Sequence, residues 1–341
     1  MVRPPRFWTE DGGLLGNTLF PLLLSPASAV ATRLVARRLA RPGFAAPVPV
    51  LCCGNATAGG AGKTTLALDL ARHLRCAGFT VHILARGYRG SLAGPLRVAA
   101  DHDATEVGDE ALLLAAAAPT WIGADRAATA RAAVAAGAEV LVMDDGMQNP
   151  TLQKSFSFIV IDGAVGFGNR RVLPAGPLRE PIFRATQRAH AAVLIGPDRR
   201  GARALLPPTL PVLSAELVAG PEAKTLAGRS VVAFAGIARP EKFFASLEET
   251  GAILVARHSY ADHHPYRPAE IARLFGQAER LGALPVTTAK DAARLPAAAR
   301  ARVFVLPIAL AWDEPAALLR LLSPVLPGAR LALPTAPRAG R

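Results

Sequence analysis

The chain has 341 residues, of which 51% are hydrophobic and 19% are charged. This composition excludes an intrinsically disordered chain, and the length gives room for two domains with a core each. The formal net charge of +13 favours an anionic partner: nucleic acid, anionic lipid or a phosphorylated substrate. The three cysteines, Cys52, Cys53 and Cys76, form no C-x-x-C pair. We therefore expect buried, reduced thiols and no metal site among them.

The first predicted element is an apolar N-terminal segment, residues 14–35, which Pro21 and Pro26 interrupt. No run of about 20 apolar residues is uninterrupted, so we expect no helix that spans a bilayer. Arginines follow the segment instead of preceding it, the reverse of a secretory signal. They are Arg33, Arg37, Arg38 and Arg41. The pattern suits an amphipathic helix in a membrane interface, and it suits equally a helix packed on the body of the protein.

A glycine-rich turn between a strand and a helix follows. Residues 48–53 predict a buried strand, residues 66–74 predict a helix, and Gly62-Lys63-Thr64 opens that helix. Glycines let backbone N–H groups approach a phosphate, and the helix N-terminus adds the positive end of a dipole. In such a loop the lysine reaches the β- and γ-phosphates and the threonine hydroxyl holds Mg²⁺. The turn predicts a nucleotide-phosphate site, although the general pattern G-x-x-x-x-G-K-[ST] has Gly where this chain has Thr57.

Beyond this turn, apolar strands alternate with helices. Strands are predicted at 81–85, 120–122, 140–143, 158–161 and 192–195, with helices at 110–117 and 126–136. After a Pro- and Gly-rich stretch, a second series has strands at 231–235, 253–257, 285–288 and 303–308, with helices at 241–249, 269–281 and 315–322. Alternation of fully apolar strands with helices predicts parallel sheets covered on both faces.

We therefore predict an α/β protein with a P-loop NTPase-like parallel sheet domain and a second, smaller α/β domain. The predicted division is an N-terminal arm at 1–45, a nucleotide-binding domain at 46–205, a connector at 206–229, a second domain at 230–325 and a flexible tail at 326–341. A cleft between two domains is a common place for a ligand.

Two pairs of acidic residues stand where elements meet. Asp144 and Asp145 end a buried strand, where a carboxylate beside a phosphate loop holds Mg²⁺. Asp109 and Glu110 follow Gly108 at a helix start, a place that favours acidic residues for structural reasons as well as functional ones.

Three loops carry further polar residues. Adjacent histidines in Asp262-His263-His264 do not easily face one metal, so we expect one of them to orient a carboxylate base. The loop at 168–181 holds three prolines and two glycines, and its rigidity and arginines suit an anionic ligand. Its charged residues include Arg170, Arg171, Arg179 and Glu180. Residues 287–291 close a strand with two threonines, Lys290 and Asp291.

In order and spacing, these motifs resemble one family. The chain carries G-N-x-T-x-G-G-x-G-K-T, R-G-Y at 86–88, G-D-E at 108–110, D-D-G-x-Q at 144–148, G-N-x-x-x-L-P-A-G-P-L-R-E-P, D-H-H-x-Y at 262–266 and T-x-K-D at 288–291. This set is similar to the tetraacyldisaccharide 4'-kinase family of lipid A biosynthesis, over about residues 8–322. Thr57 belongs to the variant of the loop that this family uses.

The resemblance implies an enzyme on the cytoplasmic face of the bacterial inner membrane. It would use ATP and Mg²⁺ to phosphorylate the 4'-hydroxyl of a tetraacylated glucosamine disaccharide 1-phosphate, giving lipid IVA. The partners it implies are this lipid and an anionic membrane surface, with no nucleic acid, and the oligomeric state stays open. A lipid acceptor makes membrane contact the favoured interpretation of the N-terminal arm.

Carried over by residue, the resemblance implies roles for single side chains. The ATP-binding stretch would be Thr57, Ala58, Gly59, Gly60, Ala61, Gly62, Lys63 and Thr64. Asp109 would be the catalytic base, partnered by His263 or else His264, with Lys63 acting on the phosphate. Metal candidates are Thr64, Asp144, Asp145 and Glu110, and substrate candidates are Arg86, Asn169, Arg171 and Arg179.

Three positions depart from the family pattern: Thr65 where Pro is usual, Asn149 where His is usual, and Ala289 where Glu is usual. Two other classes compete with a kinase. A P-loop GTPase or metallochaperone would select guanine with N-K-x-D, which residues 289–292 do not match. A nucleotide-binding module without activity is suggested by Thr57 alone.

Overall fold

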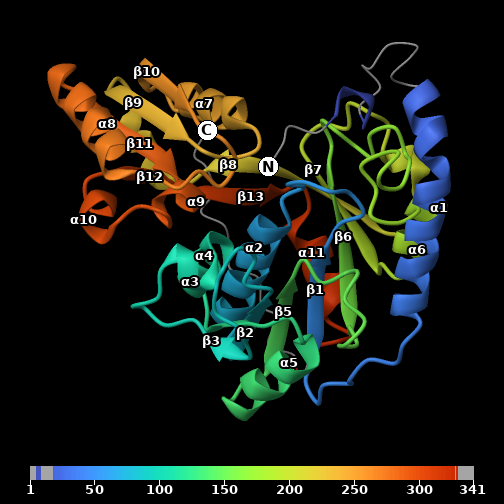
Figure 1. Ribbon diagram of the computed structural model, residues 1–341. Helices are drawn as coiled ribbons and strands as arrows, with labels where there is room; N and C mark the ends of the chain where they lie inside the picture. Colours follow the sequence, from blue (N-terminus) through green and yellow to red (C-terminus); the bar gives the residue numbers. More distant parts are fainter. Residues whose placement is uncertain (1–4, 9–17, 327, 329–341) are drawn as a thin grey trace.

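The central strands of the chain are apolar along their whole length, and such strands are stable where helices cover both faces of their sheet. The computed structural model, which describes residues 5–8, 18–326 and 328, has this arrangement in a large lobe and a small lobe (Figure 1). Within the described residues, the large lobe contains a nine-stranded sheet of order β13-β8-β7-β6-β1-β5-β2-β4-β3. The small lobe, residues 221–306, contains a four-stranded sheet of order β10-β9-β11-β12.

The large sheet is parallel except at its two edges. Its strands are β1 (Val50–Gly54), β2 (Val81–Ala85), β3 (Leu96–Arg97), β4 (Thr120–Ile122), β5 (Val140–Asp144), β6 (Phe156–Asp162), β7 (Ala191–Ile195), β8 (Val212–Ala219) and β13 (Ile308–Trp312). Strand β3 pairs antiparallel with β4, and β13 pairs antiparallel with β8. The predicted α/β fold with a parallel-dominated sheet is confirmed.

Helices cover both faces of the large sheet. They are α1 (Phe20–Leu39), α2 (Lys63–Cys76), α3 (Ala104–Val107), α4 (Asp109–Ala115), α5 (Arg126–Ala135), α6 (Ile182–Gln187) and α11 (Pro315–Leu322). Successive side chains of β1 point to opposite faces. Leu51 and Cys53 pack in the core formed with α2, α4 and α11, whereas Val50 and Cys52 pack in the core formed with α5.

The cysteine prediction holds for two of the three residues. Cys52 and Cys53 are free, buried thiols inside β1. Burial raises the pKa of the Cys52 thiol to about 11, so it stays protonated at neutral pH. Cys76 is also free, but it is exposed, because it lies on the solvent side of the last turn of α2. The expectation of a buried thiol is therefore wrong for Cys76.

The small lobe repeats the layered plan with a fully parallel sheet. Its elements are β9 (Ser230–Ala235), α7 (Pro240–Glu249), β10 (Ile253–Ser259), α8 (Pro268–Arg280), β11 (Leu284–Thr288), α9 (Ala289–Ala292), α10 (Ala297–Arg300) and β12 (Phe304–Leu306). One face packs on α7 and the other packs on α8 and α10.

The chain returns to the large lobe earlier than the sequence predicts. Strand β8 lies inside the expected connector, yet it pairs with β7 and β13 in the large sheet. The expected single strand at 303–308 is two strands, because the chain leaves the small sheet at Pro307, which has no N–H to donate. Helix α11 packs on the large core. Assigning β13 and α11 to a second domain, and β8 to a linker, is therefore wrong.

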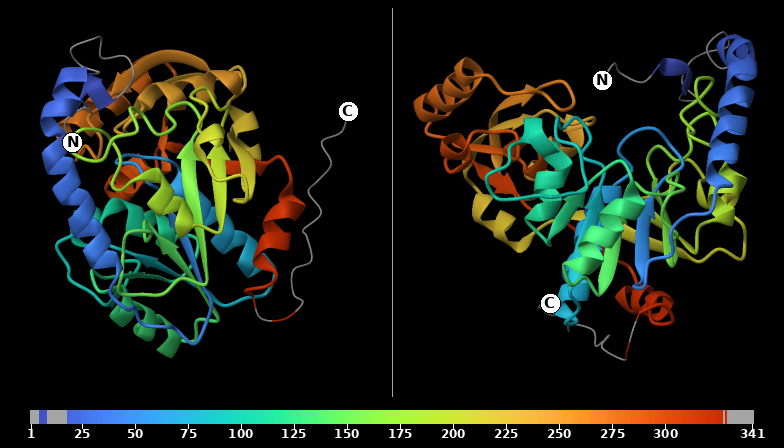
Figure 2. Two further views of the ribbon diagram at one scale, coloured as in Figure 1. Left: turned by 90° about the vertical axis from the view of Figure 1, so that its right-hand side faces the viewer. Right: turned by 60° about the horizontal axis from the view of Figure 1, so that its bottom comes forward.

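Helix α1 lies along the outside of the large lobe, next to α6 (Figure 2). The Ser28 hydroxyl donates to Val172 O at 2.7 Å, which fixes the helix to the loop at 168–181. Pro21 and Ser28 are its buried residues. Its exposed large apolar side chains are Phe20, Leu22, Leu23, Val30 and Leu34. The other parts of the predicted arm and tail, at 1–4, 9–17, 327 and 329–341, lie outside the described residues.

Among the described residues, no helix combines the length and the apolar character that crossing a membrane requires.

Candidate active site

The glycine-rich turn lies between the buried strand β1 and helix α2, as predicted. Gly62 is the N-cap residue of α2 and has a φ of 92°, in the left-handed region that favours glycine. The first N–H groups of a helix have no intrahelical acceptor. Those of α2 therefore present donors and the positive end of the helix dipole at the loop. Nothing lies within 4 Å of a Cβ built on Gly59 or Gly60, so the crest of the loop is open.

Thr57 is compatible with this loop because its backbone is paired with another segment. It forms an antiparallel bridge with Leu178, and its hydroxyl accepts a hydrogen bond from the Asn55 side chain at 3.1 Å. The next residue, Ala58, donates its N–H to Pro177 O at 2.7 Å. The loop at 168–181 thus supports the glycine-rich turn from one side, and position 57 has no need of a glycine.

Thr64 and Asp144 meet at the bottom of the loop. The Thr64 hydroxyl donates to Asp144 Oδ2 at 3.1 Å, and both residues are buried. The other oxygen, Oδ1, is buried and has no hydrogen-bond partner among the described residues. Burial, followed by the charges of Glu110 and Asp145, raises the pKa of Asp144 to about 7. A divalent cation here would supply the missing partner and favour the charged form, so the pair fits Mg²⁺, which takes one or two protein oxygens together with phosphates.

Asp145 is in a different environment from its neighbour. Its Oδ1 lies 2.8 Å from Arg179 Nη1 and 3.6 Å from Lys63 Nζ. Burial alone would raise the pKa of Asp145, but the charges of Lys63 and Arg179 hold it below its ordinary value. Asp145 thus stays ionised and holds the side chains of Lys63 and Arg179 at the mouth of the loop.

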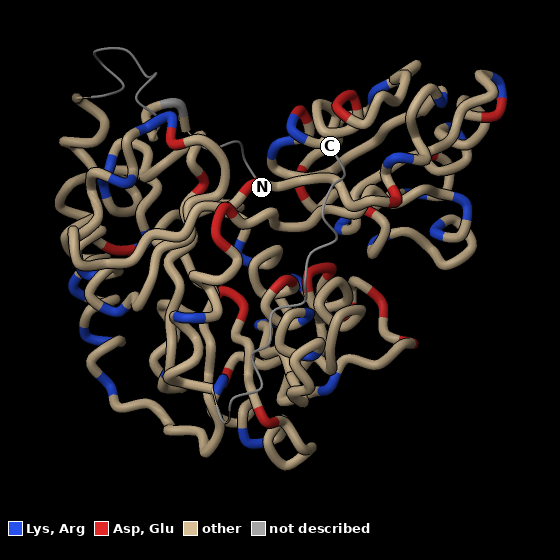
Figure 3. Tube along the Cα trace, turned by 180° about the vertical axis from the view of Figure 1, so that it is seen from behind, with Lys and Arg blue, Asp and Glu red and all other residues tan. Residues whose placement is uncertain are grey.

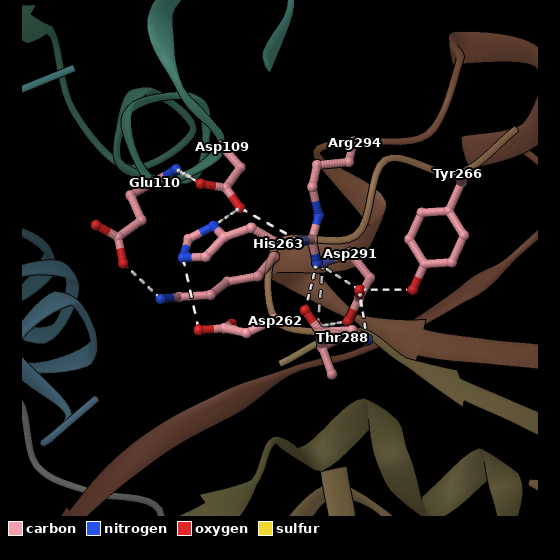
Figure 4. A network of polar contacts seen from close by, with 10 residues as sticks. Asp109, Glu110, Asp262, His263, Tyr266, Thr288, Asp291 and Arg294 are labelled. Carbon is pink, nitrogen blue, oxygen red and sulfur yellow. Dashed lines mark hydrogen bonds and ion pairs between the residues drawn. The ribbon is translucent and has the colours of Figure 1, made fainter. Parts of the chain in front are cut away.

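Asp109 and His263, far apart in the sequence, are in direct contact between the lobes (Figure 4). His263 Nδ1 lies 2.8 Å from Asp109 Oδ2, and the Asp109 side chain is 5% exposed. Burial alone would raise the pKa of Asp109, but the hydrogen bond from His263 and the charges of His263 and Arg294 hold it below its ordinary value. An ionised carboxylate can only accept, so Nδ1 donates.

Local backbone geometry presents both residues. Asp109 begins α4 after Gly108, which has a φ of 86°, and a Cβ there would come within 2.4 Å of Tyr88 O. His263 has a φ of 59°, a left-handed conformation that is uncommon outside glycine. The adjacent His264 points elsewhere, since its Nε2 lies 3.0 Å from Glu270 Oε2. Of the two histidines, His263 is the one beside Asp109.

Glu110 is engaged by the small lobe. Lys290 Nζ donates to Glu110 Oε1 at 2.6 Å. Burial alone would lower the pKa of Lys290, but the charges of Glu110, Asp109 and Asp144 raise it, so this lysine stays protonated. Within the described residues, no three His, Cys, Asp or Glu side chains form a group that could hold a metal. The predicted metal role of Glu110 stays untested, and its observed partner is an ammonium group.

The four substrate candidates have different surroundings. Arg86 is exposed just after β2, whereas Arg179 lies against Asp145 beside the phosphate loop. The Asn169 amide donates to Phe7 O at 2.8 Å and Ala175 O at 2.9 Å, so it holds the loop together. Exposed Arg171 lies 3.5 Å from the Ser25 hydroxyl of α1.

The structure shows the local role of two of the three residues that depart from the family pattern. The Asn149 side chain accepts from Thr151 N and closes a turn, and Ala289 begins the short helix α9. Nothing in the structure explains Thr65.

Sequence reasoning missed two buried arginines. Arg126 begins α5 with its guanidinium on Gly123 O and carries a charge that acts on Asp144 and Asp145. Burial lowers its pKa to about 10. Arg294 lies 3.7 Å from Asp109. Neither is in a contiguous motif, and in a chain with 34 arginines nothing marks these two as buried.

Comparison with known proteins gives one consistent result. The sequence model of the family described as tetraacyldisaccharide-1-P 4'-kinase matches residues 20–326. The tetraacyldisaccharide 4'-kinase of Gluconacetobacter diazotrophicus is 57% identical over 323 residues, covering 94% of this chain and 97% of that protein. That of Rhodospirillum centenum is 54% identical over 331 residues, covering 96% and 98%. The solved structure of LpxK from Aquifex aeolicus in complex with ATP is similar with a TM-score of 0.74 and 25% identity, covering 90% of this chain and 99% of that one.

Proposed function

The chain belongs to the tetraacyldisaccharide 4'-kinase family, and we propose that it transfers the γ-phosphate of ATP to the 4'-hydroxyl of tetraacyldisaccharide 1-phosphate. The product of this phosphotransfer is lipid IVA, an intermediate of lipid A biosynthesis. The observation that carries the assignment of roles is the contact between the lobes at Asp109, whose Oδ2 lies 2.8 Å from His263 Nδ1.

Phosphoryl transfer depends mainly on positioning and on neutralising charge. Lys63 and the N–H groups at the start of α2 bind the β- and γ-phosphates, and Arg179 adds a second cation at the same mouth. Thr64 and Asp144 would hold Mg²⁺, which when bound neutralises charge on these phosphates. The open crest at Gly59 and Gly60 leaves room for the phosphate chain.

Asp109 serves as the general base in this proposal. Its lowered pKa keeps it ionised at neutral pH, so it can accept the proton of the 4'-hydroxyl as the new P–O bond forms. His263 holds one carboxylate oxygen, Oδ2, through Nδ1, and the other oxygen, Oδ1, accepts from Glu110 N at 2.9 Å. The base therefore has one orientation when the substrate arrives.

The experiment that tests this function is transfer of labelled phosphate from ATP or GTP to purified tetraacyldisaccharide 1-phosphate. We expect a labelled lipid with ATP and at least about a tenfold preference over GTP. Nucleotide hydrolysis without a labelled lipid would support the switch class, and nucleotide binding without turnover would support the inactive module. Either result would overturn the proposal.

We also propose that α1 contacts an anionic membrane at the cytoplasmic face of the inner membrane, where a lipid acceptor would be reached. Support comes from its exposed apolar residues and from the arginines of its C-terminal half (Figure 3). Replacing exposed Leu22, Leu23 and Leu34 with Gln should reduce cosedimentation with vesicles containing anionic lipid by about tenfold, because each side chain inserts apolar area. Exposed Leu281 of the small lobe gives the matched control, Leu281→Gln. Equal vesicle binding by the triple variant would remove α1 from the proposed contact.

A further inference from the structure

One arginine of the small lobe is buried against the proposed base and has no role in the scheme above. Arg294 lies two residues after α9, and its side chain is 7% exposed. Its Nη1 lies 3.7 Å from Asp109 Oδ2, the oxygen to which His263 Nδ1 is bonded. Figure 4 shows the guanidinium and the imidazole approaching this carboxylate from the small lobe, while Asp109 comes from α4. Nε and Nη1 of Arg294 have no hydrogen-bond partner among the described residues.

Arg294 is held in this position by a fully buried carboxylate. Its Nη2 lies 2.5 Å from Asp291 Oδ1 and donates to Gly236 O at 3.0 Å. Asp291 also accepts from Gly236 N at 2.8 Å, from the Tyr266 hydroxyl at 2.7 Å and from the Thr288 hydroxyl at 2.5 Å. These contacts join the ends of β9 and β11 to the loop before α8. The T-x-K-D motif, whose function the sequence left open, therefore forms the support of Arg294.

The same support sets the position of His263. The carbonyl of Gly236 accepts both the Arg294 guanidinium at 3.0 Å and the His263 backbone N–H at 3.0 Å. Arg294 and His263, which both face Asp109, are thus hydrogen-bonded to the same backbone carbonyl. A buried guanidinium is stable only with compensating negative charge, and Asp291 and Asp109 are the carboxylates that provide it.

We propose that Arg294 is a positioning residue for Asp109, which together with His263 holds the carboxylate in the orientation that receives the proton of the acceptor hydroxyl. This proposal rests on the proposed role of Asp109 as the base. In this proposal Arg294 acts through Asp109 and binds no part of the nucleotide. Its replacement should lower turnover without changing nucleotide affinity, and the loss should depend on the presence of Asp109.

The test is a double-mutant cycle on the full chain, with ATP and the lipid acceptor in steady-state assays. Arg294→Gln should lower kcat by about 10- to 100-fold, the cost of a misplaced catalytic group, with the KM for ATP within about twofold of the unmodified protein. Arg294→Lys keeps the positive charge but loses the planar guanidinium. Its kcat should lie between that of Arg294→Gln and that of the unmodified protein. Arg302→Gln is the matched control, since Arg302 belongs to the same lobe and pairs at the surface with Glu279.

The second half of the cycle separates positioning from folding. In an Asp109→Ala background, Arg294→Gln should change kcat by less than about twofold, because its target is already gone. The positioning role would be overturned if the double variant lost kcat by the product of the two single losses, or if Arg294→Gln alone had a normal kcat. Either result would leave the kinase function standing. A normal kcat for Asp109→Ala alone would overturn the base assignment together with the role of Arg294. Thermal unfolding midpoints show which variants are folded. If Arg294→Gln does not fold, the same cycle is measured with Arg294→Lys.

Discussion

The two sides of the site are built differently, although they meet at one place. On the nucleotide side, Asp144 ends β5 and Thr64 begins α2 in the large lobe, and β5 pairs with β1, the strand before α2, with Cys53 opposite Asp144. On the acceptor side, Asp109 and His263 are 154 residues apart and come from different lobes. Both residues of the first pair belong to the large lobe, so this contact does not depend on the small lobe. The second pair exists only while the lobes are in contact, so binding of ATP and turnover should be separable by substitution.

The largest expected effect is on the acceptor side. Asp109→Ala should lower kcat by about 10²- to 10⁴-fold, as for loss of a general base, with little change in the KM for ATP. Steady-state kinetics with both substrates varied measure this. Asp313→Ala, at an exposed position directly after β13, controls for the loss of a carboxylate. Unchanged turnover in the Asp109 variant would exclude this residue from the mechanism.

The reciprocal substitution on the nucleotide side should weaken the use of ATP itself. Lys63→Ala removes the cation beside Asp145, and we expect kcat/KM for ATP to fall by about 10²- to 10³-fold. The KM for the lipid should stay close to its normal value, because the acceptor side is unaltered. Lys224→Ala, in the small lobe, is the matched lysine control. Normal ATP kinetics in the Lys63 variant would contradict the assignment of the loop, and a changed lipid KM would contradict the separation of the two sides.

The smallest expected effect is on stability within the large lobe alone. His73 Nδ1 lies 3.3 Å from Asp69 Oδ2, and this carboxylate also accepts from the Trp312 indole of β13 at 2.9 Å. The hydrogen bond to Asp69 raises the pKa of His73, although burial opposes the shift. A raised folded-state pKa gives stability that is present below the unfolded value of about 6.5 and is lost as pH rises through the folded value.

Urea unfolding at pH 5.5 and pH 8.5 checks this sign. The free energy of unfolding should exceed that of a His73→Gln variant by more at pH 5.5 than at pH 8.5, while turnover at a fixed pH stays the same. His102→Gln provides a histidine control at the surface. A stability difference that grows toward pH 8.5 would refute the coupling between His73 and Asp69.

Sequence predicted the contiguous parts of this molecule and missed the assembled ones. The glycine-rich turn, the strand that ends in Asp144 and the helix that begins at Asp109 are local patterns, and local patterns survive in the fold. Arg126 and Arg294 acquire their surroundings only from packing between distant segments, so no pattern marks them. The return of β13 to the large sheet was missed for a similar reason: a strand's partner is a non-local choice, and Pro307 divides a run that is apolar throughout.

The pairing of β13 with β8 has a consequence for how the small lobe is connected to the large lobe. Gly220 donates its N–H to Pro307 O at 2.8 Å, and Ala219 pairs with Ile308, so the small lobe leaves and re-enters the large sheet at a single point (Figure 1). Residues 221–306 are therefore inserted into a hairpin, and a two-residue Asn-Gly turn in place of residues 220–307 would join β8 directly to β13. The nucleotide side and the histidine side are thus carried by two pieces of chain that join at this one point.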